Sequence, residues 1–295
     1  MKKMKFIAIA VAVLAIGVLA LAGCSSGGGQ QAKESEGSAP VESSAAPEAA
    51  AETSAAPGAA EGTLVVGFDQ EYPPYGFVGE DGDFTGFDLE LAQEVCARNG
   101  WTYVAQPINW DTKLTELNAG VFTCIWNGFT MEGREDDYAF SEPYMDNGQV
   151  VMVKADSDIQ KLTDLADKTV ATQVDSAGYE VLTGDQADLA ATFKALEERD
   201  TYEIAVTELD AGAFDALACD LSVAAYYMAI TPDKYRVLDE YLSQEHYAVG
   251  FKKGNEAMAD QVTATLREMT ADGFVEALCE KYAEYGISFD NWVLK

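Results

Sequence analysis

Residues 63–92 read TLVVGFDQEYPPYGFVGEDGDFTGFDLELA and contain a short strand, a turn and the start of a helix. The apolar run 63–68 is typical of a strand that is buried on both faces. Residues 79–83 (GEDGD) predict a hairpin turn, because glycine and aspartate supply turn geometry. Phe87, Leu91 and Val95 mark one face of a helix that should end near residues 99–100, Asn-Gly. A buried strand followed by an amphipathic helix predicts a parallel α/β unit.

The same alternation continues along the rest of the chain. It predicts further strands at 103–105, 121–126, 149–153, 169–173, 216–219 and 247–251. It predicts helices at 113–118, 162–165, 177–182 and 187–196, around 206–211, and over most of 256–285. Because the pattern restarts near residue 149, two α/β lobes between which the chain crosses more than once are the natural architecture.

The N-terminus carries the features of an export signal. Lys2, Lys3 and Lys5 precede an apolar run at 6–22, which is short for a membrane span and ends shortly before Cys24. The segment resembles a bacterial lipoprotein signal, which implies removal of residues 1–23 and lipidation of Cys24. Lipid chains would then hold the protein at a membrane without spanning it. The alternatives are an ordinary signal peptide and an uncleaved anchor.

Residues 24–62 are predicted to form a disordered tether. From residue 30 onward this segment is almost entirely Ala, Ser, Glu, Pro and Gly, and it lacks the large apolar side chains that offset the entropy of ordering. An Ala-rich helix is the alternative, and Pro47 and Pro57 would interrupt it.

Composition and motifs exclude several classes of function. The formal net charge of -31 argues against nucleic acid as a partner. Without a GxGxxG or Walker sequence, or a CxxC pair, the chain offers no nucleotide motif and no zinc-ribbon or thioredoxin-type site. His246 is the only histidine, so the sequence offers no histidine cluster for a metal. A calcium-binding loop starting at Asp81 is excluded, because Ala92 occupies the twelfth position, where a glutamate is needed. Cys96, Cys124, Cys219 and Cys279 are interpreted mainly as small core residues, with one disulfide among them as the alternative.

Two local patterns suggest a ligand site. Asp69 and Tyr72 follow the first strand, where Pro73 and Pro74 stiffen the loop so that both side chains can face one cleft. Arg134 is the single cation within an acidic run at 132–137, where it could hold an anion. The alternatives are a packed surface loop and a surface cation that balances its neighbours.

Taken together, these landmarks resemble the bacterial solute-binding proteins for polar amino acids, which serve ABC importers. The resemblance extends from residue 62 to about 285. The motifs that carry it are Gly67-x-Asp69-x-x-Tyr72-Pro73-Pro74, Phe84-Thr85-Gly86-Phe87-Asp88-Leu89-Glu90-Leu91-Ala92, Trp110-Asp111, Asn127-Gly128-Phe129-Thr130 with Arg134, Phe140-Ser141-Glu142-Pro143-Tyr144, Asp215-Ala216-x-x-x-Asp220-x-x-x-Ala224 and Ala271-Asp272-Gly273.

The resemblance implies the type II periplasmic-binding-protein fold, with a ligand cleft between two α/β lobes that are joined by two hinge crossings. The crossings are placed near 145–147 and 243–246. Lobe 1 would comprise 63–145 plus 246–295, and lobe 2 would comprise 147–243. The lobes would close on the ligand by hinge motion.

The resemblance also implies how an amino acid would be held. Arg134 would bind the α-carboxylate, because a guanidinium presents a fork of donors, with help from the Thr130 backbone N–H, Ser176 and the N–H groups that open the 177–182 helix. Asp220, the Gly128 carbonyl and the Thr130 hydroxyl would bind the α-ammonium. Tyr72 and Trp110 would pack against the side chain, and Asp69 would meet its polar end. The full implied set is Asp69, Tyr72, Trp110, Asn127, Gly128, Thr130, Arg134, Gln173, Ser176, Ala177 and Asp220, with no catalytic residue, metal or other cofactor.

Three positions depart from the family pattern. One residue fewer than usual separates Thr130 from Arg134, which requires a tighter loop. The run 175–177 reads Asp-Ser-Ala where Gly-Ser/Thr-Thr is common, so a hydroxyl is missing and a carboxylate is close by. Trp126 replaces a smaller aliphatic residue and either narrows the pocket or belongs to the core.

The predicted function is capture of a free polar amino acid, with an amide or cationic side chain favoured, for delivery to an ABC permease. The protein would be a monomer, lipid-anchored on the extracytoplasmic face of a bacterial cell membrane. One alternative is an amino-acid sensor domain that presents its bound state to a signalling partner. The other is a cyclohexadienyl-dehydratase-like enzyme on the same fold, which needs a buried carboxylic acid as general acid; Glu71 is the nearest candidate.

Overall fold

The computed structural model describes residues 62–295. The predicted signal peptide, Cys24 and all of the predicted tether except its last residue lie outside the described residues. Between residues 62 and 295, no helix combines the length and the apolar character that a membrane span requires.

The first sheet contains the strand with which the sequence analysis began. Its five strands run in the order β5-β1-β6-β14-β7. β1 pairs in parallel with β5 on one side and β6 on the other, which explains why five of its six residues are buried. β14 runs antiparallel to β6 and β7 and joins them. The strand bounds are Thr63–Phe68 (β1), Thr102–Pro107 (β5), Cys124–Ile125 (β6), Tyr138–Phe140 (β7) and Gly250–Lys252 (β14).

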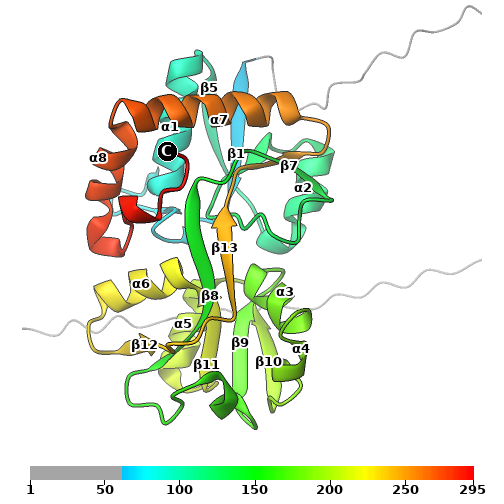
Figure 1. The fold of residues 1–295 in the computed structure, drawn as a ribbon, viewed down its shortest axis with the longest axis vertical. Coiled ribbons are helices and arrows are strands. Elements are labelled where there is room, and N and C mark those ends of the chain that lie inside the picture. The colour runs from blue at the N-terminus through cyan, green and yellow to red at the C-terminus, as the bar shows by residue number, and fades with distance from the viewer. Residues whose placement is uncertain (1–61) are drawn as a thin grey trace, which may run out of the picture. The chain divides into compact units, whose positions relative to one another are not determined.

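Helices from both ends of the described chain pack around this sheet (Figure 1). The predicted amphipathic helix is α1, and its buried positions include Phe87, Leu91 and Val95. A small antiparallel sheet, β2-β3-β4, forms the predicted hairpin turn between β3 and β4. The bounds are Glu71–Tyr72 (β2), Gly76–Val78 (β3), Phe84–Thr85 (β4), Phe87–Asn99 (α1), Lys113–Ala119 (α2), Glu256–Ala271 (α7) and Phe274–Lys281 (α8).

The second sheet is built mainly from the middle of the chain. Its strands run in the order β10-β9-β11-β8-β12, and β13 also pairs with β8. The strand bounds are Met145–Lys154 (β8), Thr169–Gln173 (β9), Ala195–Arg199 (β10), Ala216–Asp220 (β11), Tyr235–Val237 (β12) and Ser243–Tyr247 (β13). The helices of this part are Ala177–Thr183 (α3), Ala187–Ala190 (α4), Tyr202–Ala211 (α5) and Leu221–Ile230 (α6), and short 3-10 helices occur at Trp110–Thr112, Leu162–Leu165, Ala283–Tyr285 and Phe289–Asn291.

Two strands connect the sheets. β8 and β13 pair in antiparallel fashion from Met145 opposite Tyr247 to Gln149 opposite Ser243, and Figure 1 shows them running side by side between the two sheets. The fold is therefore the predicted pair of α/β lobes joined by two crossings. The residue boundaries given above for the lobes stay a prediction.

The sequence prediction was wrong in one part of the second lobe. Residues 187–196 were predicted to be helical, but α4 ends at Ala190 and β10 begins at Ala195. Alanine and leucine favour a helix locally, whereas β10 gains a full parallel ladder with β9, from Ala195 opposite Thr169 to Arg199 opposite Gln173. Tertiary pairing overrides the local preference there.

The four described cysteines agree with the core interpretation. Cys96, Cys124, Cys219 and Cys279 are all free and buried. Burial raises the pKa of the Cys96 thiol to about 11 and that of Cys279 to about 12, so both are inert thiols at neutral pH.

Candidate functional site

The structure gathers nine of the eleven predicted ligand residues around one cavity. The cavity has a volume of about 10 Å³, room for about one water molecule. A residue outside the predicted set, Tyr202 at the start of α5, also lines it. The nine predicted residues are Tyr72, Trp110, Gly128, Thr130, Arg134, Gln173, Ser176, Ala177 and Asp220. Their elements belong to both sheets, so the cavity lies between the lobes.

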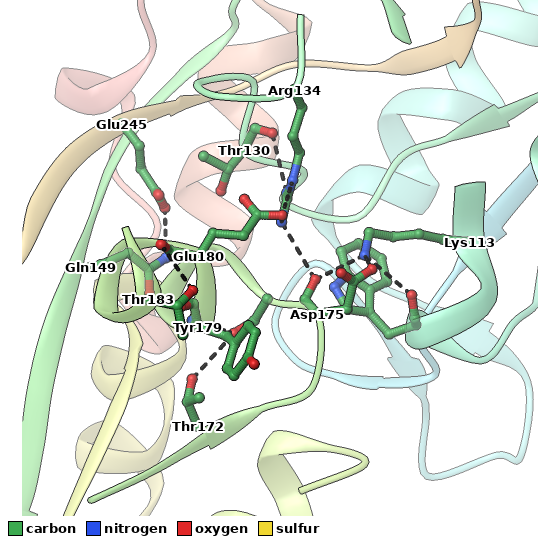
Figure 2. A network of polar contacts seen from close by, with 12 residues as sticks. Lys113, Thr130, Arg134, Gln149, Thr172, Asp175, Tyr179, Glu180, Thr183 and Glu245 are labelled. Atoms are coloured by element: carbon green, nitrogen blue, oxygen red, sulfur yellow. Dashed lines mark hydrogen bonds and ion pairs between the residues drawn. The ribbon is translucent and has the colours of Figure 1, made fainter. Parts of the chain in front are cut away.

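Arg134 enters the cavity from the first lobe with its guanidinium held on several sides. Nε and Nη2 each donate to Glu180 Oε1 at 3.1 Å, and Nη1 donates to the Thr130 carbonyl at 3.3 Å. The guanidinium carbon lies 4.8 Å from the centre of the Phe129 ring. Figure 2 shows Glu180 reaching Arg134 from the second lobe. Arg134 is buried, whereas the acidic residues 135–137 are exposed, so this cation faces the cavity while those neighbours face solvent.

The short loop between Thr130 and Arg134 closes as a tight turn. The Arg134 N–H donates to the Met131 carbonyl at 3.1 Å, and Gly133 has φ +81, a left-handed conformation that suits glycine. Met131 in turn donates its N–H to the His246 carbonyl at 3.0 Å, which ties the loop to β13. The loop is thus one residue shorter than the family pattern and still leaves Arg134 on the wall of the cavity.

Asp220 stands at the end of β11, opposite Arg134. Its Oδ1 accepts hydrogen bonds from Tyr247 Oη at 2.8 Å, Gln149 Nε2 at 2.9 Å and Asn147 Nδ2 at 3.1 Å. Asp220 is 4% exposed. Within residues 62–295 its partners are neutral donors, and Asp220 forms no ion pair there. Such a carboxylate can accept a cationic group from the cavity.

Aromatic side chains form the apolar part of the cavity wall. Tyr72 and Tyr202 lie with ring centres 6.0 Å apart, one from each lobe. Tyr72 Oη lies 3.2 Å from Tyr247 Oη, which links this wall to the Asp220 hydrogen-bond set. Trp110 packs edge-on against Phe129 at 5.7 Å. These rings leave little room for water beside the charged groups.

Asp69 and Asn127 do not line this cavity. Asn127 Oδ1 accepts the Asp69 N–H at 2.8 Å and so fixes the loop after β1. Asp69 Oδ2 accepts from Gln173 Nε2 across the cleft at 2.8 Å, and Asp69 lines an adjoining cavity of about 230 Å³. Burial raises the pKa of Asp69, opposed by the Glu71 N–H and Gln173. Trp110 lines both cavities, so they are neighbours.

The carboxylate of Asp175 has a partner in the first lobe. Lys113 Nζ pairs with Asp175 Oδ2 and also donates to the Asp175 carbonyl at 2.8 Å and the Trp110 carbonyl at 3.2 Å. Lys113 is 2% exposed and lies 5.0 Å from the Trp110 ring centre. Burial and the charge of Arg134 lower the pKa of Lys113 to about 8, opposed by Asp175. The departure at residue 175 thus supplies an ion pair across the cleft (Figure 2).

We expect the Lys113–Asp175 pair to contribute about 1 kcal/mol to the folded, closed protein, because Asp175 is half-exposed and its charge is screened. The measurement is a double-mutant cycle with Lys113→Met and Asp175→Gly, scored by chemical denaturation. Glycine suits the backbone at residue 175, where φ is +51. The exposed pair Lys168–Asp158 is the matched control and should show near-zero coupling. Strictly additive effects of Lys113→Met and Asp175→Gly would contradict this expectation.

A fully buried acid supports the cavity from behind. Asp88 Oδ2 accepts the Gly128 N–H at 2.6 Å and Tyr144 Oη at 2.7 Å. Burial raises the pKa of Asp88 to about 7, opposed by Tyr144, Gly128 and the nearby Trp126 indole, which lies outside hydrogen-bond geometry. Gly128 itself has φ +57, and a Cβ there would lie 3.0 Å from Tyr72 and 3.1 Å from Tyr247. Asp88 therefore fixes the backbone at Gly128, where any other residue would be strained.

Trp126 belongs to the core, which is one of the two alternatives that the sequence left open: it is fully buried, its ring centre lies 6.4 Å from that of Tyr144, and it does not line the cavity. Three other residues of the site region were not predicted as site residues. Tyr202 could have been noticed, because Thr201 is a helix N-cap residue and places Tyr202 at the start of α5. Glu180 and Lys113 carried no signal beyond their charge, because their roles depend on contacts between segments far apart in the chain.

Comparison with known proteins agrees with the fold. Residues 64–285 match the model of the bacterial extracellular solute-binding proteins, family 3. The L-cystine-binding protein TcyJ of Escherichia coli K12 is 32% identical over 227 residues, covering 75% of this chain and 82% of that protein. The L-cystine-binding protein TcyA of Bacillus subtilis is 26% identical, covering 91% of this chain and 94% of that protein.

Solved structures show the same similarity. A substrate-binding protein of an ABC uptake transporter from Streptococcus pneumoniae, with bound histidine, superposes with a TM-score of 0.73 at 30% identity, covering 77% of this chain and 94% of that one. An ancestral arginine-binding protein bound to glutamine gives a TM-score of 0.69 at 31% identity, covering 76% of this chain and 99% of that one. The family model spans most of the described residues and the two-lobed fold is shared with these structures. The chain therefore belongs to the bacterial extracellular solute-binding proteins, family 3.

Proposed function

We propose that this protein captures a free α-amino acid between its lobes. The observation that carries the proposal is the pairing of a buried cation, Arg134, with a buried carboxylate, Asp220, on the wall of one cavity. A zwitterionic amino acid presents the opposite charges, and buried charges need such partners. The cavity is too small for a ligand as it stands, so binding requires movement of the lobes about β8 and β13, as hinge closure does elsewhere.

The adjoining cavity indicates which side chains the protein favours. Asp69, Asp111 and Asp200 line it and no lysine, arginine or histidine is among its lining residues. A ligand side chain that passes Trp110 would bring its end toward these carboxylates, which suit a cationic or amide group better than a carboxylate. The relatives named for cystine, histidine, arginine and glutamine support a polar amino acid as the ligand class.

The remainder of the proposal concerns delivery. We infer that the protein is a monomer that acts outside the cytoplasm and passes its ligand to an ABC permease, as family membership suggests. Lipidation of Cys24 would hold it at the extracytoplasmic face of the membrane. The chain acts by binding rather than catalysis: Glu71, the residue considered as a general acid, lines a different cavity with Gln70, Tyr226 and Tyr227.

A thermal-shift screen of the purified chain against the twenty amino acids, cystine and ornithine tests the proposal. A ligand at one hundred times its dissociation constant adds about 2.7 kcal/mol of stability to the folded state. We expect a clear rise in melting temperature with one or a few amino acids that carry an amide or cationic group. No rise with any of these compounds would sink the amino-acid proposal.

Asp220→Asn serves as the site variant in the same screen. It keeps the shape of the side chain but removes the charge that would hold the α-ammonium, so the ligand-induced shift should vanish. Asp136→Asn, which removes an exposed carboxylate near Arg134, is the matched control and should preserve the shift.

A further inference from the structure

A second buried carboxyl group stands directly behind Asp220. Glu245 lies in β13, is 3% exposed and does not line the ligand cavity. Its Oε1 accepts from Asn147 Nδ2 at 2.6 Å and from Gln149 Nε2 at 2.9 Å. The same two amide nitrogens donate to Asp220 Oδ1, so two carboxyl groups share one pair of donors. Figure 2 shows the Glu245 side chain directed at Gln149.

No cation within residues 62–295 forms an ion pair with this carboxyl pair. The titratable groups that act on Glu245 are Asp220 from β11, Tyr72 from β2, and Tyr247 from its own strand. The neighbouring residue His246 lines a further cavity of about 260 Å³ together with Glu245 and Asp146, but its ring nitrogens pair with Glu132 and Asp146 and not with Glu245.

Two negative charges that share only neutral donors cannot both be stable in a buried site. Burial, and next the charge of Asp220, raise the pKa of Glu245 well above its usual range. Glu245 Oε2 is buried without a hydrogen-bond partner, which is costly for a carboxylate and less so for a neutral acid. Asp220 has the additional hydroxyl donor Tyr247, so the geometry favours the negative charge on Asp220 and the proton on Glu245.

We propose that Glu245 is a positioning residue that carries the proton of the Asp220–Glu245 pair and releases it when a ligand ammonium group binds at Asp220. The inference rests on the proposed capture of an amino acid. The charge balance is simple: the Glu245 O–H bond breaks, the proton leaves to solvent, and the ammonium group supplies the positive charge that the proton had supplied. Ligand affinity therefore increases as pH rises through the range in which Glu245 is protonated in the ligand-free protein.

Calorimetric titration with L-arginine, L-glutamine, L-histidine and L-cystine tests the proposal. Repeating each titration in buffers of different ionisation enthalpy counts the protons exchanged. For the amino acid that binds, we expect the unmodified protein to release up to one proton between pH 5 and 7.5. The dissociation constant should fall by up to tenfold per pH unit. L-histidine titrates within this range, so its own proton is counted separately with the free ligand.

Glu245→Gln keeps the hydrogen-bonding shape and removes the titrating group. It should bind with no proton release and with an affinity that is nearly constant over the same pH range. Asp146→Asn, which removes a nearby carboxylate that pairs with His246 and shares no donor with Glu245, is the matched control and should release as many protons as the unmodified protein.

The outcomes separate this inference from the proposed function. Binding by the unmodified protein without proton release, or an equal release by Glu245→Gln, overturns the role of Glu245 and leaves amino-acid capture standing. The first of these results needs no variant, so it holds even if Glu245→Gln does not fold. If none of the four amino acids binds, the titration is repeated with the amino acid found in the thermal-shift screen; if that screen finds none, amino-acid capture fails and the role of Glu245 fails with it.

Discussion

Arg134→Ala is expected to weaken binding of the captured amino acid by about 10²–10³-fold. Removing one partner of a buried, hydrogen-bonded charge pair costs about 3–5 kcal/mol, and about 1.4 kcal/mol corresponds to a factor of ten. Arg134 is 5% exposed and its guanidinium is already oriented by Glu180, Thr130 and Phe129. A ligand carboxylate that takes the place of Glu180 on Nε and Nη2 would therefore meet a preformed fork of donors. Calorimetric titration with the amino acid found in the thermal-shift screen measures the loss.

Two further comparisons make this prediction specific. Arg134→Lys should also bind weakly, because an ammonium group presents a point charge rather than a fork of donors. The substitution Arg134→Ala should reduce the affinity for the decarboxylated amine of the same ligand far less than the affinity for the amino acid. The amine lacks the carboxylate that Arg134 would hold. Arg267→Ala, at a half-exposed arginine paired with Glu142, is the matched control. Retention of affinity within threefold by Arg134→Ala would place the carboxylate elsewhere.

Asp88→Asn is expected to change how stability depends on pH. An acid whose pKa is raised by folding, here from 3.8 to about 7, stabilises the folded state fully below its unfolded pKa. That contribution is lost as pH rises through about 7, because ionisation is then easier in the unfolded chain. Asparagine resembles the neutral acid but does not ionise. Between pH 5 and pH 8 the original protein should therefore lose on the order of 3 kcal/mol of unfolding free energy relative to Asp88→Asn.

Chemical denaturation at several pH values measures this difference. Asp88→Ala provides the contrast, because it leaves the Gly128 N–H and the Tyr144 hydroxyl without their acceptor. Since neither variant titrates at residue 88, Asp88→Ala should be less stable than Asp88→Asn by on the order of 3 kcal/mol at every pH in that range. Asp83→Asn, at an exposed turn, is the control and should leave the pH dependence unchanged. A pH profile of Asp88→Asn parallel to that of the original protein would show that Asp88 is ionised throughout.

The parts of the fold that could be predicted are those in which local pattern and tertiary role agree. β1 is a continuous apolar run because its alternate residues pack into two different core clusters, and α1 shows helical spacing because one of its faces packs into the core. Helix α6 was not predicted, since LSVAAYYMAI is apolar on nearly all sides and has no clear period. The start of β10 was predicted as helix because its pairing with β9 leaves no local trace in the sequence.

Only part of the candidate site could be predicted from the sequence. Arg134 and Asp220 stood out because each matches a motif and carries charge in a meaningful place. Asp88 lies within one of the family motifs, at 84–92. A carboxylate in the first turn of a helix normally indicates an exposed residue, whereas Asp88 is fully buried. Glu245 matters only through a contact with a residue 96 positions away in the chain, and Glu180 through a contact with one 46 positions away. No local pattern encodes such contacts.

The position of β14 sets an order for folding during synthesis. All strands of the second sheet lie between Met145 and Tyr247, so its pairing partners emerge as one uninterrupted piece of chain. The first sheet must wait, because β6 and β7 are joined only when β14 arrives more than a hundred residues later. Closing so long a loop is slow, and the waiting edges of β6 and β7 are open to wrong partners. Assembly of the N-terminal half is therefore completed last, by the C-terminal part of the chain.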